Sequence, residues 1–167
     1  MTMIEIGKKG NYIISAVLIA VSFIALRPAL AYLLYRRAGD YMSAGIVPDA
    51  ARTYEKTLVF NGRDVDSRNW LAYCYSLMGR DDKALVEYEK AIELDPDDVV
   101  ALFDVGMIYR KGGDLKTAGE YFSKAAAARQ SPNVTDQNYK FYTKSAGTML
   151  EVIAKAGKKV LFTRFWM

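Results

Sequence analysis

The chain has 167 residues, of which 51% are hydrophobic and 25% are charged, and its formal net charge is +4. This composition is typical of one globular domain with an additional segment, and the length excludes a large multidomain enzyme. Acidic and basic residues are interspersed, which favours a solvated surface over a nucleic-acid-binding patch. Histidine is absent, so the commonest general base and the commonest zinc ligand are missing. We therefore expect no enzyme activity, no cofactor, no metal site and no nucleic-acid partner.

The most apolar segment lies near the amino terminus. Residues 12–26 carry no charge, and the apolar run resumes at 29–35 after Arg27 and Pro28. As one helix, residues 12–35 would be roughly 36 Å long, against about 30 Å for the hydrocarbon core of a bilayer. The sequence thus predicts a transmembrane-type helix within residues 1–35, with Arg27 near one interface and a bend at Pro28.

Other interpretations of this segment remain open. Lys8 and Lys9 resemble the basic region of a secretory signal peptide, with a cleavage site at residues 29–31. A buried helix of a soluble domain is a further alternative. For an uncleaved anchor, the short basic amino terminus favours a single-pass membrane protein whose remaining residues are periplasmic or extracellular.

The stretch MTMIE, residues 1–5, resembles the start of a mature type IV pilin, in which the fifth residue is a glutamate before a long apolar helix. The stretch GKKGN, residues 7–11, departs from that pattern because the pilin helix stays apolar there. The resemblance implies an alternative function as a subunit of an extracellular filament, with the amino-terminal helices forming its core. Glu5 and Arg27 would then be candidates for assembly contacts.

A pattern of small and aromatic residues recurs every 34 positions. In the middle copy it comprises Gly79, Ala84, Tyr88 and Ala91; the downstream copy has Gly113, Ala118, Phe122 and Ala125, and the upstream copy has Gly45, Ala50, Tyr54 and Thr57. The small residues Ala38, Ala72 and Gly106 follow the same interval ahead of each glycine. Small residues on one helix leave room for rings on its antiparallel neighbour, and a glycine suits the left-handed residue that ends a helix.

This spacing resembles the tetratricopeptide repeat. The resemblance implies an all-α solenoid of about three helix-turn-helix repeats, with helix pairs at residues 31–64, 65–98 and 99–130. A long hydrophobic amino-terminal helix would run into repeat one. We accordingly divide the chain into an amino-terminal flank and helix at 1–35, a solenoid at 36–130, and a capping helix with an aromatic tail at 131–167.

The capping helix is predicted from apolar residues on one helical face. These residues are Tyr139, Tyr142, Ala146, Met149, Leu150 and Ile153. We expect this helix to close the exposed end of the solenoid. The tail adds Phe162, Phe165 and Trp166, which would pack on the capping helix, a membrane interface or a neighbouring subunit.

The resemblance also implies a partner-binding surface, because solenoids bind through the concave face formed by the first helix of each repeat. The candidate groove residues are Asn69, Tyr73, Leu77, Phe103, Met107, Arg110 and Lys111. Such a groove would be apolar and aromatic with a basic edge, suited to an apolar helix or an extended peptide. Separately, Asn133 begins a glycosylation sequon.

These features predict a non-enzymatic, membrane-anchored scaffold for protein–protein interaction or for the assembly of a membrane complex. Its expected partners are proteins bound on the concave face and the membrane bound by the amino-terminal helix. In the filament alternative, other copies of the chain replace the membrane.

Overall fold

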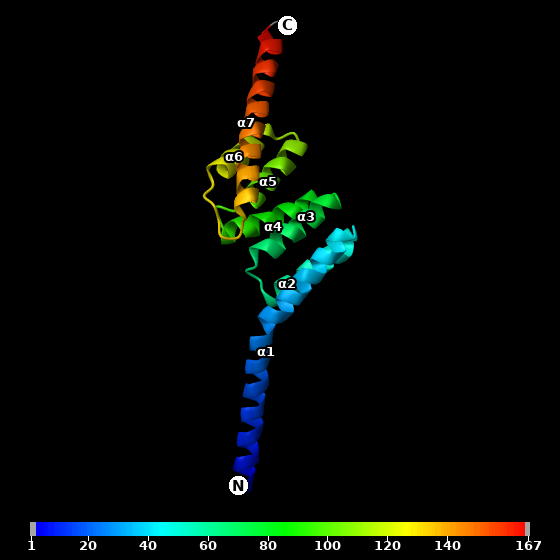
Figure 1. The fold of residues 1–167 in the computed structure, drawn as a ribbon, viewed down its shortest axis with the longest axis vertical. Coiled ribbons are helices and arrows are strands. Elements are labelled where there is room, and N and C mark those ends of the chain that lie inside the picture. Colours follow the sequence, from blue (N-terminus) through cyan, green and yellow to red (C-terminus); the bar gives the residue numbers. More distant parts are fainter. Residues whose placement is uncertain (1–2, 166–167) are drawn as a thin grey trace.

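A computed structural model describes the backbone of residues 3–165 and the side chains of residues 16–18, 21–22 and 24–156. Within this part of the chain all regular structure is helical (Figure 1). The seven helices are α1 (Met3–Ser43), α2 (Val47–Phe60), α3 (Val65–Leu77), α4 (Asp81–Leu94), α5 (Val99–Lys111), α6 (Leu115–Ala127) and α7 (Asp136–Phe165). The predicted all-α solenoid is confirmed.

The three helix pairs are joined by turns of one kind. Gly45, Gly79 and Gly113 have φ angles of 73°, 72° and 85°, and each follows the first helix of its pair. After α1, the backbone N–H of Ile46 donates to the carbonyl of Tyr41 at 2.9 Å, which is the bond expected of a left-handed glycine turn. The recurrence of glycine every 34 residues therefore reflects a backbone requirement.

Inside each pair, one large ring fills the space beside one small residue. Tyr54, Tyr88 and Phe122 of the second helices are at most 2% exposed. Gly106 shows how close this approach is, because a methyl group added there would lie 2.7 Å from Cε1 of Phe122. The packing of rings against small residues thus occurs as the repeat pattern predicts.

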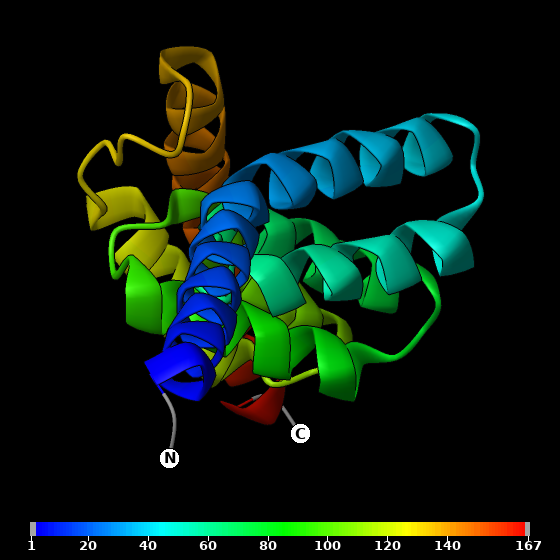
Figure 2. The same cartoon turned by 90° about the horizontal axis from the view of Figure 1, so that it is seen from below.

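Helix α7 covers the far end of the solenoid, lying against α6 and α5 (Figure 2). Ala146 is fully buried in the cluster around Phe122, and the other five apolar residues predicted for this face pack against the same cluster. At the start of α7, the Thr135 hydroxyl accepts a hydrogen bond from the backbone N–H of Asn138 at 3.3 Å. The hydroxyl of Tyr139 donates to the carbonyl of Ala128 at 2.9 Å, which joins α7 to the end of α6.

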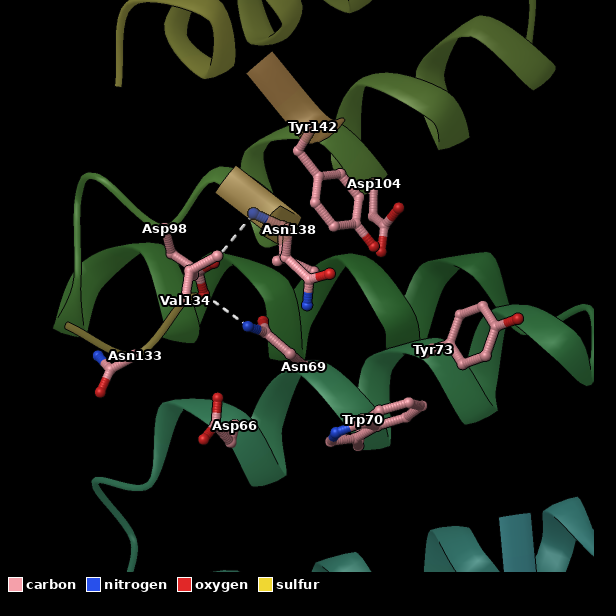
Figure 3. Close-up of a pocket in the computed structure, with 11 residues that line it drawn as sticks. Asp66, Asn69, Trp70, Tyr73, Asp98, Asp104, Asn133, Val134, Asn138 and Tyr142 are labelled. Atoms are coloured by element: carbon pink, nitrogen blue, oxygen red, sulfur yellow. Dashed lines mark hydrogen bonds between the residues drawn. The ribbon is translucent and has the colours of Figure 1, made fainter. Parts of the chain in front are cut away.

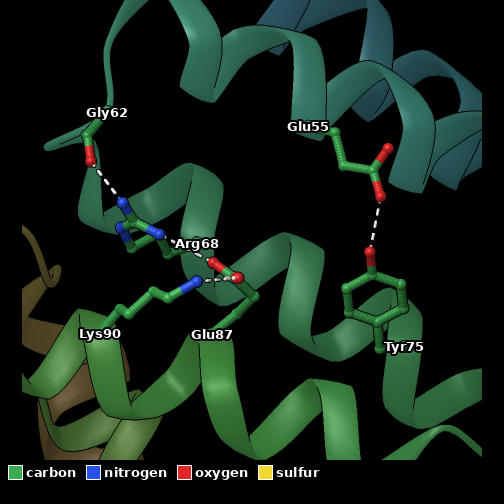
Figure 4. A network of polar contacts seen from close by, with 6 residues as sticks. All are labelled: Glu55, Gly62, Arg68, Tyr75, Glu87 and Lys90. Atoms are coloured by element: carbon green, nitrogen blue, oxygen red, sulfur yellow. Dashed lines mark hydrogen bonds and ion pairs between the residues drawn. The ribbon is translucent and has the colours of Figure 1, made fainter.

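A polar network links the middle repeat to the first (Figure 4). The Arg68 guanidinium donates to the Glu87 carboxylate at 2.8 Å and to the carbonyl of Gly62 at 2.6 Å. Lys90 contacts the same carboxylate at 2.7 Å, and the Tyr75 hydroxyl donates to Glu55 at 2.5 Å. Because Arg68 and Glu87 are both largely buried, this pair fixes the distance between α3 and α4.

Helix α1 is 41 residues long, contains Pro28 and bends along its length (Figure 1). No helix in the described part of the chain has a stretch long and apolar enough to cross a membrane. Among the described residues, the apolar runs of α1 are interrupted at Arg27 and Pro28 and end at Arg36. The Arg27 guanidinium donates to the carbonyl of Val59 in α2 at 3.1 Å, where a membrane interface was expected.

The expectation of a single-pass membrane protein is therefore wrong. The described residues also give no support to a pilin-like filament core.

Candidate functional site

The first of two adjoining cavities lies between α3, α5 and α7 and has a volume of about 370 Å³ (Figure 3). Ligand pockets in proteins commonly measure about 300–1,000 Å³. The wall on α3 comprises Asp66, Asn69, Trp70 and Tyr73; α5 and its cap provide Asp98, Val100 and Asp104; the remaining lining residues are Asn133, Val134, Asn138 and Tyr142. The cavity is thus built from two repeats, the loop before α7 and α7 itself.

Helical geometry explains the α3 wall, because residues three, four and seven positions apart lie on one face. Trp70 and Tyr73 are each 40% exposed, and their ring centroids are 6.0 Å apart at an angle of 76°. Trp70 also stacks on Tyr54 of the first repeat, with the centroids 6.4 Å apart. These contacts hold two aromatic rings at the edge of the cavity.

Asp98 is the fully buried amino-terminal cap of α5. Its carboxylate accepts hydrogen bonds from the backbone N–H of Val100 at 3.0 Å and of Ala101 at 3.3 Å. The amide of Asn69 donates to its other oxygen at 2.6 Å, as Figure 3 shows. Burial raises the pKa of Asp98, although these three hydrogen bonds oppose the shift.

Asp104 lies about one and a half helical turns after Asp98, in α5, and is half-buried in the lining of this cavity. Its carboxylate accepts a hydrogen bond from the Tyr88 hydroxyl at 2.9 Å. Burial raises the pKa of Asp104 to about 6, and the nearby Asp98 charge acts in the same direction. Desolvation, followed by the charges of Asp64 and Asp98, also raises the pKa of Asp66. The cavity therefore concentrates carboxylates in an environment that disfavours their charged forms.

The second cavity shares Tyr73 and Asp104 with the first and has a volume of about 340 Å³. Its other lining residues are Ser76, Tyr88, Phe103, Met107, Ile108, Arg110 and Lys111. The two cavities together form what we call the groove. It runs along α3 and α5, the first helices of repeats two and three.

The structure places six of the seven predicted groove residues in these cavities. Asn69 lines the first, Tyr73 lines both, and Phe103, Met107, Arg110 and Lys111 line the second. Leu77 lines neither cavity; it is 52% exposed at the end of α3, one turn beyond Tyr73. Whether these residues bind a partner stays a prediction.

The basic edge is partly neutralised. The Lys111 ammonium lies 2.7 Å from the Asp81 carboxylate. Nε of Arg110 is buried without a hydrogen-bond partner among the described residues, as is Oδ1 of Asn69. These two buried atoms therefore have no hydrogen-bond partner within the described part of the protein.

The sequence pattern does not assign Trp70, Asp98, Asp104 or Tyr142 to the groove. Asp98 caps α5 through one carboxylate oxygen, and that role gives no direction for the other oxygen. Tyr142 comes from α7, whose docking position the repeat pattern does not specify.

The other predicted site residues are dispersed. The Asn133 side chain donates to Asp95 at 3.3 Å and lines the first cavity, and its glycosylation stays a prediction. Arg27 contacts α2, as described above. Glu5, Phe162, Phe165 and Trp166 lie outside the described side chains.

Solved structures with a similar fold include chaperones of secretion translocators. The type III secretion chaperone SycD of Yersinia enterocolitica, in complex with a peptide of the translocator YopD, has a TM-score of 0.68 at 21% identity, covering 75% of this chain and 93% of that one. PcrH of Pseudomonas aeruginosa has a TM-score of 0.66 at 22% identity, covering 74% of this chain and 91% of that one. At these identities the likeness shows the fold alone.

Curated relatives include proteins named photosystem I assembly protein Ycf3. The one from Prochlorococcus marinus strain SARG is 31% identical over 108 residues, which are 63% of this chain and 62% of that protein. The one from Prochlorococcus marinus subspecies pastoris is 27% identical over 128 residues, covering 71% of this chain and 74% of that protein. The chain thus spans less than two thirds of the length of the first of these relatives.

Two family models, both of the tetratricopeptide repeat, match this sequence at residues 65–98 and 87–120. The first match coincides with the pair formed by α3 and α4, and the second extends through α5 into α6. Together with the three glycine turns and the 34-residue spacing, these matches show that the chain contains tetratricopeptide repeats.

Proposed function

We propose that this chain is a non-enzymatic scaffold that binds an extended segment of a partner protein in the groove and thereby supports the assembly of a protein complex. The groove carries the proposal, because its two cavities adjoin and share Tyr73 and Asp104. A continuous groove of this kind suits a chain segment with several side chains better than one compact ligand.

The state of the groove residues supports the same function. Trp70 and Tyr73 expose aromatic surface at the rim, and residues of this type commonly dominate binding at protein interfaces. Asn69 and Arg110 add an amide and a guanidinium to the lining of the groove, both of which can hydrogen-bond to protein backbone or side chains. The lining comes from helices that are held rigidly by their repeat packing, so little ordering is needed on binding.

Proteins similar to this chain support the proposal that the bound segment belongs to a protein on its way into a complex. SycD and PcrH have been solved with a peptide of YopD and with the chaperone-binding region of PopD, respectively. The curated relatives are named as assembly proteins. We therefore propose that the partner segment belongs to a protein that is held until it joins a larger complex.

Selection of a displayed library of random peptides on the immobilised full-length chain tests this function. Selected peptides are then titrated against the wild-type chain and the variant Tyr73→Glu, which places a charge on exposed aromatic surface that lines both cavities. We expect Tyr73→Glu to weaken binding at least about tenfold, because desolvating an unpaired carboxylate opposes the bound state.

The matched control is Val86→Glu, since Val86 is 48% exposed against 40% for Tyr73 and lies on α4 outside both cavities. Its binding should equal that of the wild-type chain. Selection of no peptide, or equal loss of binding in both variants, would contradict the proposed function.

A further inference from the structure

The first cavity has a strongly unbalanced lining. Three of its residues, Asp66, Asp98 and Asp104, are carboxylates, and none of the described lining residues is a lysine or an arginine. This acidity stands out in a chain whose net charge is +4. Clefts lined by charges of one sign and walled by protein concentrate ligands of the opposite sign.

The acceptors in the cavity also exceed what the protein itself satisfies. Asp66 has no hydrogen bond from another described side chain, and one oxygen of Asp104 accepts from Tyr88 while the other is left free. Oδ1 of Asn69 is buried without a donor, because the Asn69 amide nitrogen is directed to Asp98. A ligand that fits must therefore supply hydrogen-bond donors.

The aromatic residues narrow the chemistry further. Trp70, Tyr73 and Tyr142 line the same cavity as the carboxylates (Figure 3). An aromatic face attracts a cation. A guanidinium interacts with such a face in a second way, because it is planar and can also stack on the ring. A guanidinium also has five N–H donors and no acceptor, which complements a lining that contains three carboxylates.

A bound metal ion is the other cation to consider. Among the described residues there is no group of three or more carboxylate, thiol or imidazole side chains placed to hold one. The carboxylates are distributed over α3, the cap of α5 and the middle of α5. That distribution suits an extended planar cation that reaches several oxygens.

We propose that the first cavity holds an arginine side chain of the bound partner segment. This inference rests on the function proposed above and specifies which residue the groove selects. The carboxylates of Asp66 and Asp104 accept hydrogen bonds from the guanidinium, and Trp70 and Tyr73 pack against its face.

The test uses the full-length chain and short peptide libraries that are identical except at one fixed central position. That position holds arginine in one library, citrulline in a second and glutamate in a third. Citrulline has nearly the same shape as arginine but no charge. We expect the arginine library to be retained about tenfold or more above the citrulline library, because charge-assisted hydrogen bonds are lost in the latter.

Two variants connect this preference to the cavity. Asp66→Asn and Asp104→Asn keep the side-chain shape and remove the charge, and each should reduce the ratio of arginine to citrulline retention severalfold. The matched control is Asp82→Asn, since Asp82, like Asp66, is an acidic residue in the first turn of its helix but lies outside both cavities. Its ratio should match that of the wild-type chain.

The possible results separate the two proposals. Equal retention of the arginine and citrulline libraries would overturn the arginine assignment and leave peptide binding in place. A preference for arginine that persists in both cavity variants would also overturn it. Retention of none of the libraries would count against the arginine assignment and the proposed function together.

Discussion

Asp104 lies where the two cavities of the groove meet, and its carboxylate accepts a hydrogen bond from the Tyr88 hydroxyl, which is itself buried. Burial raises the pKa of Asp104 to about 6, so the native fold favours the neutral form of this group. Tyr73, Tyr88, Asp98 and Tyr142 line the two cavities with it, and so do Arg110 and Lys111, of which Lys111 is paired with Asp81. When the Asp104 carboxylate is ionised, it can therefore bind a cation, but its partial burial lowers the stability of the folded chain.

The raised pKa of Asp104 makes the free energy of unfolding depend on pH. The pKa of Asp104 is higher in the folded chain, at about 6, than its ordinary value of 3.8, so the folded state binds the proton more tightly. The contribution of Asp104 to the free energy of unfolding is greatest below pH 3.8 and is lost as the pH rises through about 6. Above that pH the ionised carboxylate destabilises the fold by on the order of 2–3 kcal/mol, at about 1.4 kcal/mol per pKa unit.

Asp104→Asn removes that ionisation while keeping an oxygen that can accept from Tyr88. We expect the variant to be more stable than the wild-type chain at neutral pH and equally stable near pH 4, as measured by urea unfolding across this range. Asp66 and Asp98 titrate in both proteins, so the difference between the two stability curves reports the ionisation of Asp104 together with its interaction with Asp98. A stability difference that is independent of pH would contradict the shift at Asp104.

At the scale of the helical element, the interface between α5 and α6 depends on one missing methyl group. Gly106 is fully buried in α5 and faces the ring of Phe122 in α6. The matching positions in the first two pairs hold Ala38 and Ala72, beside Tyr54 and Tyr88. The third pair therefore brings its ring closer to the helix backbone than an alanine would allow.

Gly106→Ala should destabilise the chain by about 1–2 kcal/mol. Overpacking typically costs about 1–3 kcal/mol, and the higher helix propensity of alanine offsets up to about 1 kcal/mol of it. The control is Gly119→Ala in α6, where an added methyl group meets nothing within 4 Å. That variant should be stabilised by roughly 0.5–1 kcal/mol. Thermal or urea unfolding of both proteins gives the comparison, and a stabilised Gly106→Ala would show that Phe122 has room to move.

At the scale of the whole molecule, the repeats contact their neighbours in sequence, and α7 closes one end (Figure 1). In a solenoid of this kind, stability is roughly a sum of repeat and nearest-neighbour terms. Helix α7 has two roles, because its buried face covers the cluster around Phe122 and its residues Asn138 and Tyr142 line the groove. Detaching α7 should therefore affect the last repeat and the groove together.

Ala146→Glu tests that role, because Ala146 is fully buried between α7 and the cluster around Phe122. A carboxylate without a partner there would cost several kcal/mol, which favours release of α7. Hydrogen exchange should become faster in α5, α6 and α7 and stay unchanged in α2. Thr148→Glu, which places the same charge on the exposed face of α7, is the control and should leave exchange unchanged. Uniformly faster exchange in all helices would contradict the nearest-neighbour description.

Local residue chemistry and spacing made much of the fold predictable. The glycines at 45, 79 and 113, the buried rings beside small residues and the apolar face of α7 are each set by interactions within about one repeat, and all occur as expected. The amino-terminal prediction was wrong because no helix in the described part of the chain has a stretch long and apolar enough to cross a membrane. There, Arg27 of α1 bonds to the backbone of α2.

The groove residues also fall into a group that the sequence predicted and a group that only the structure placed there. From sequence, the repeat register placed Asn69, Tyr73, Phe103 and Arg110 toward one face, because a position within a repeat fixes its side of the helix. Only the tertiary structure decided that Asp98 and Asp104 line a cavity with Tyr142 of α7. The reason is that periodicity determines the direction of a side chain about its own helix, whereas the chemistry of a cavity depends on which distant helices approach it and which charges they bury.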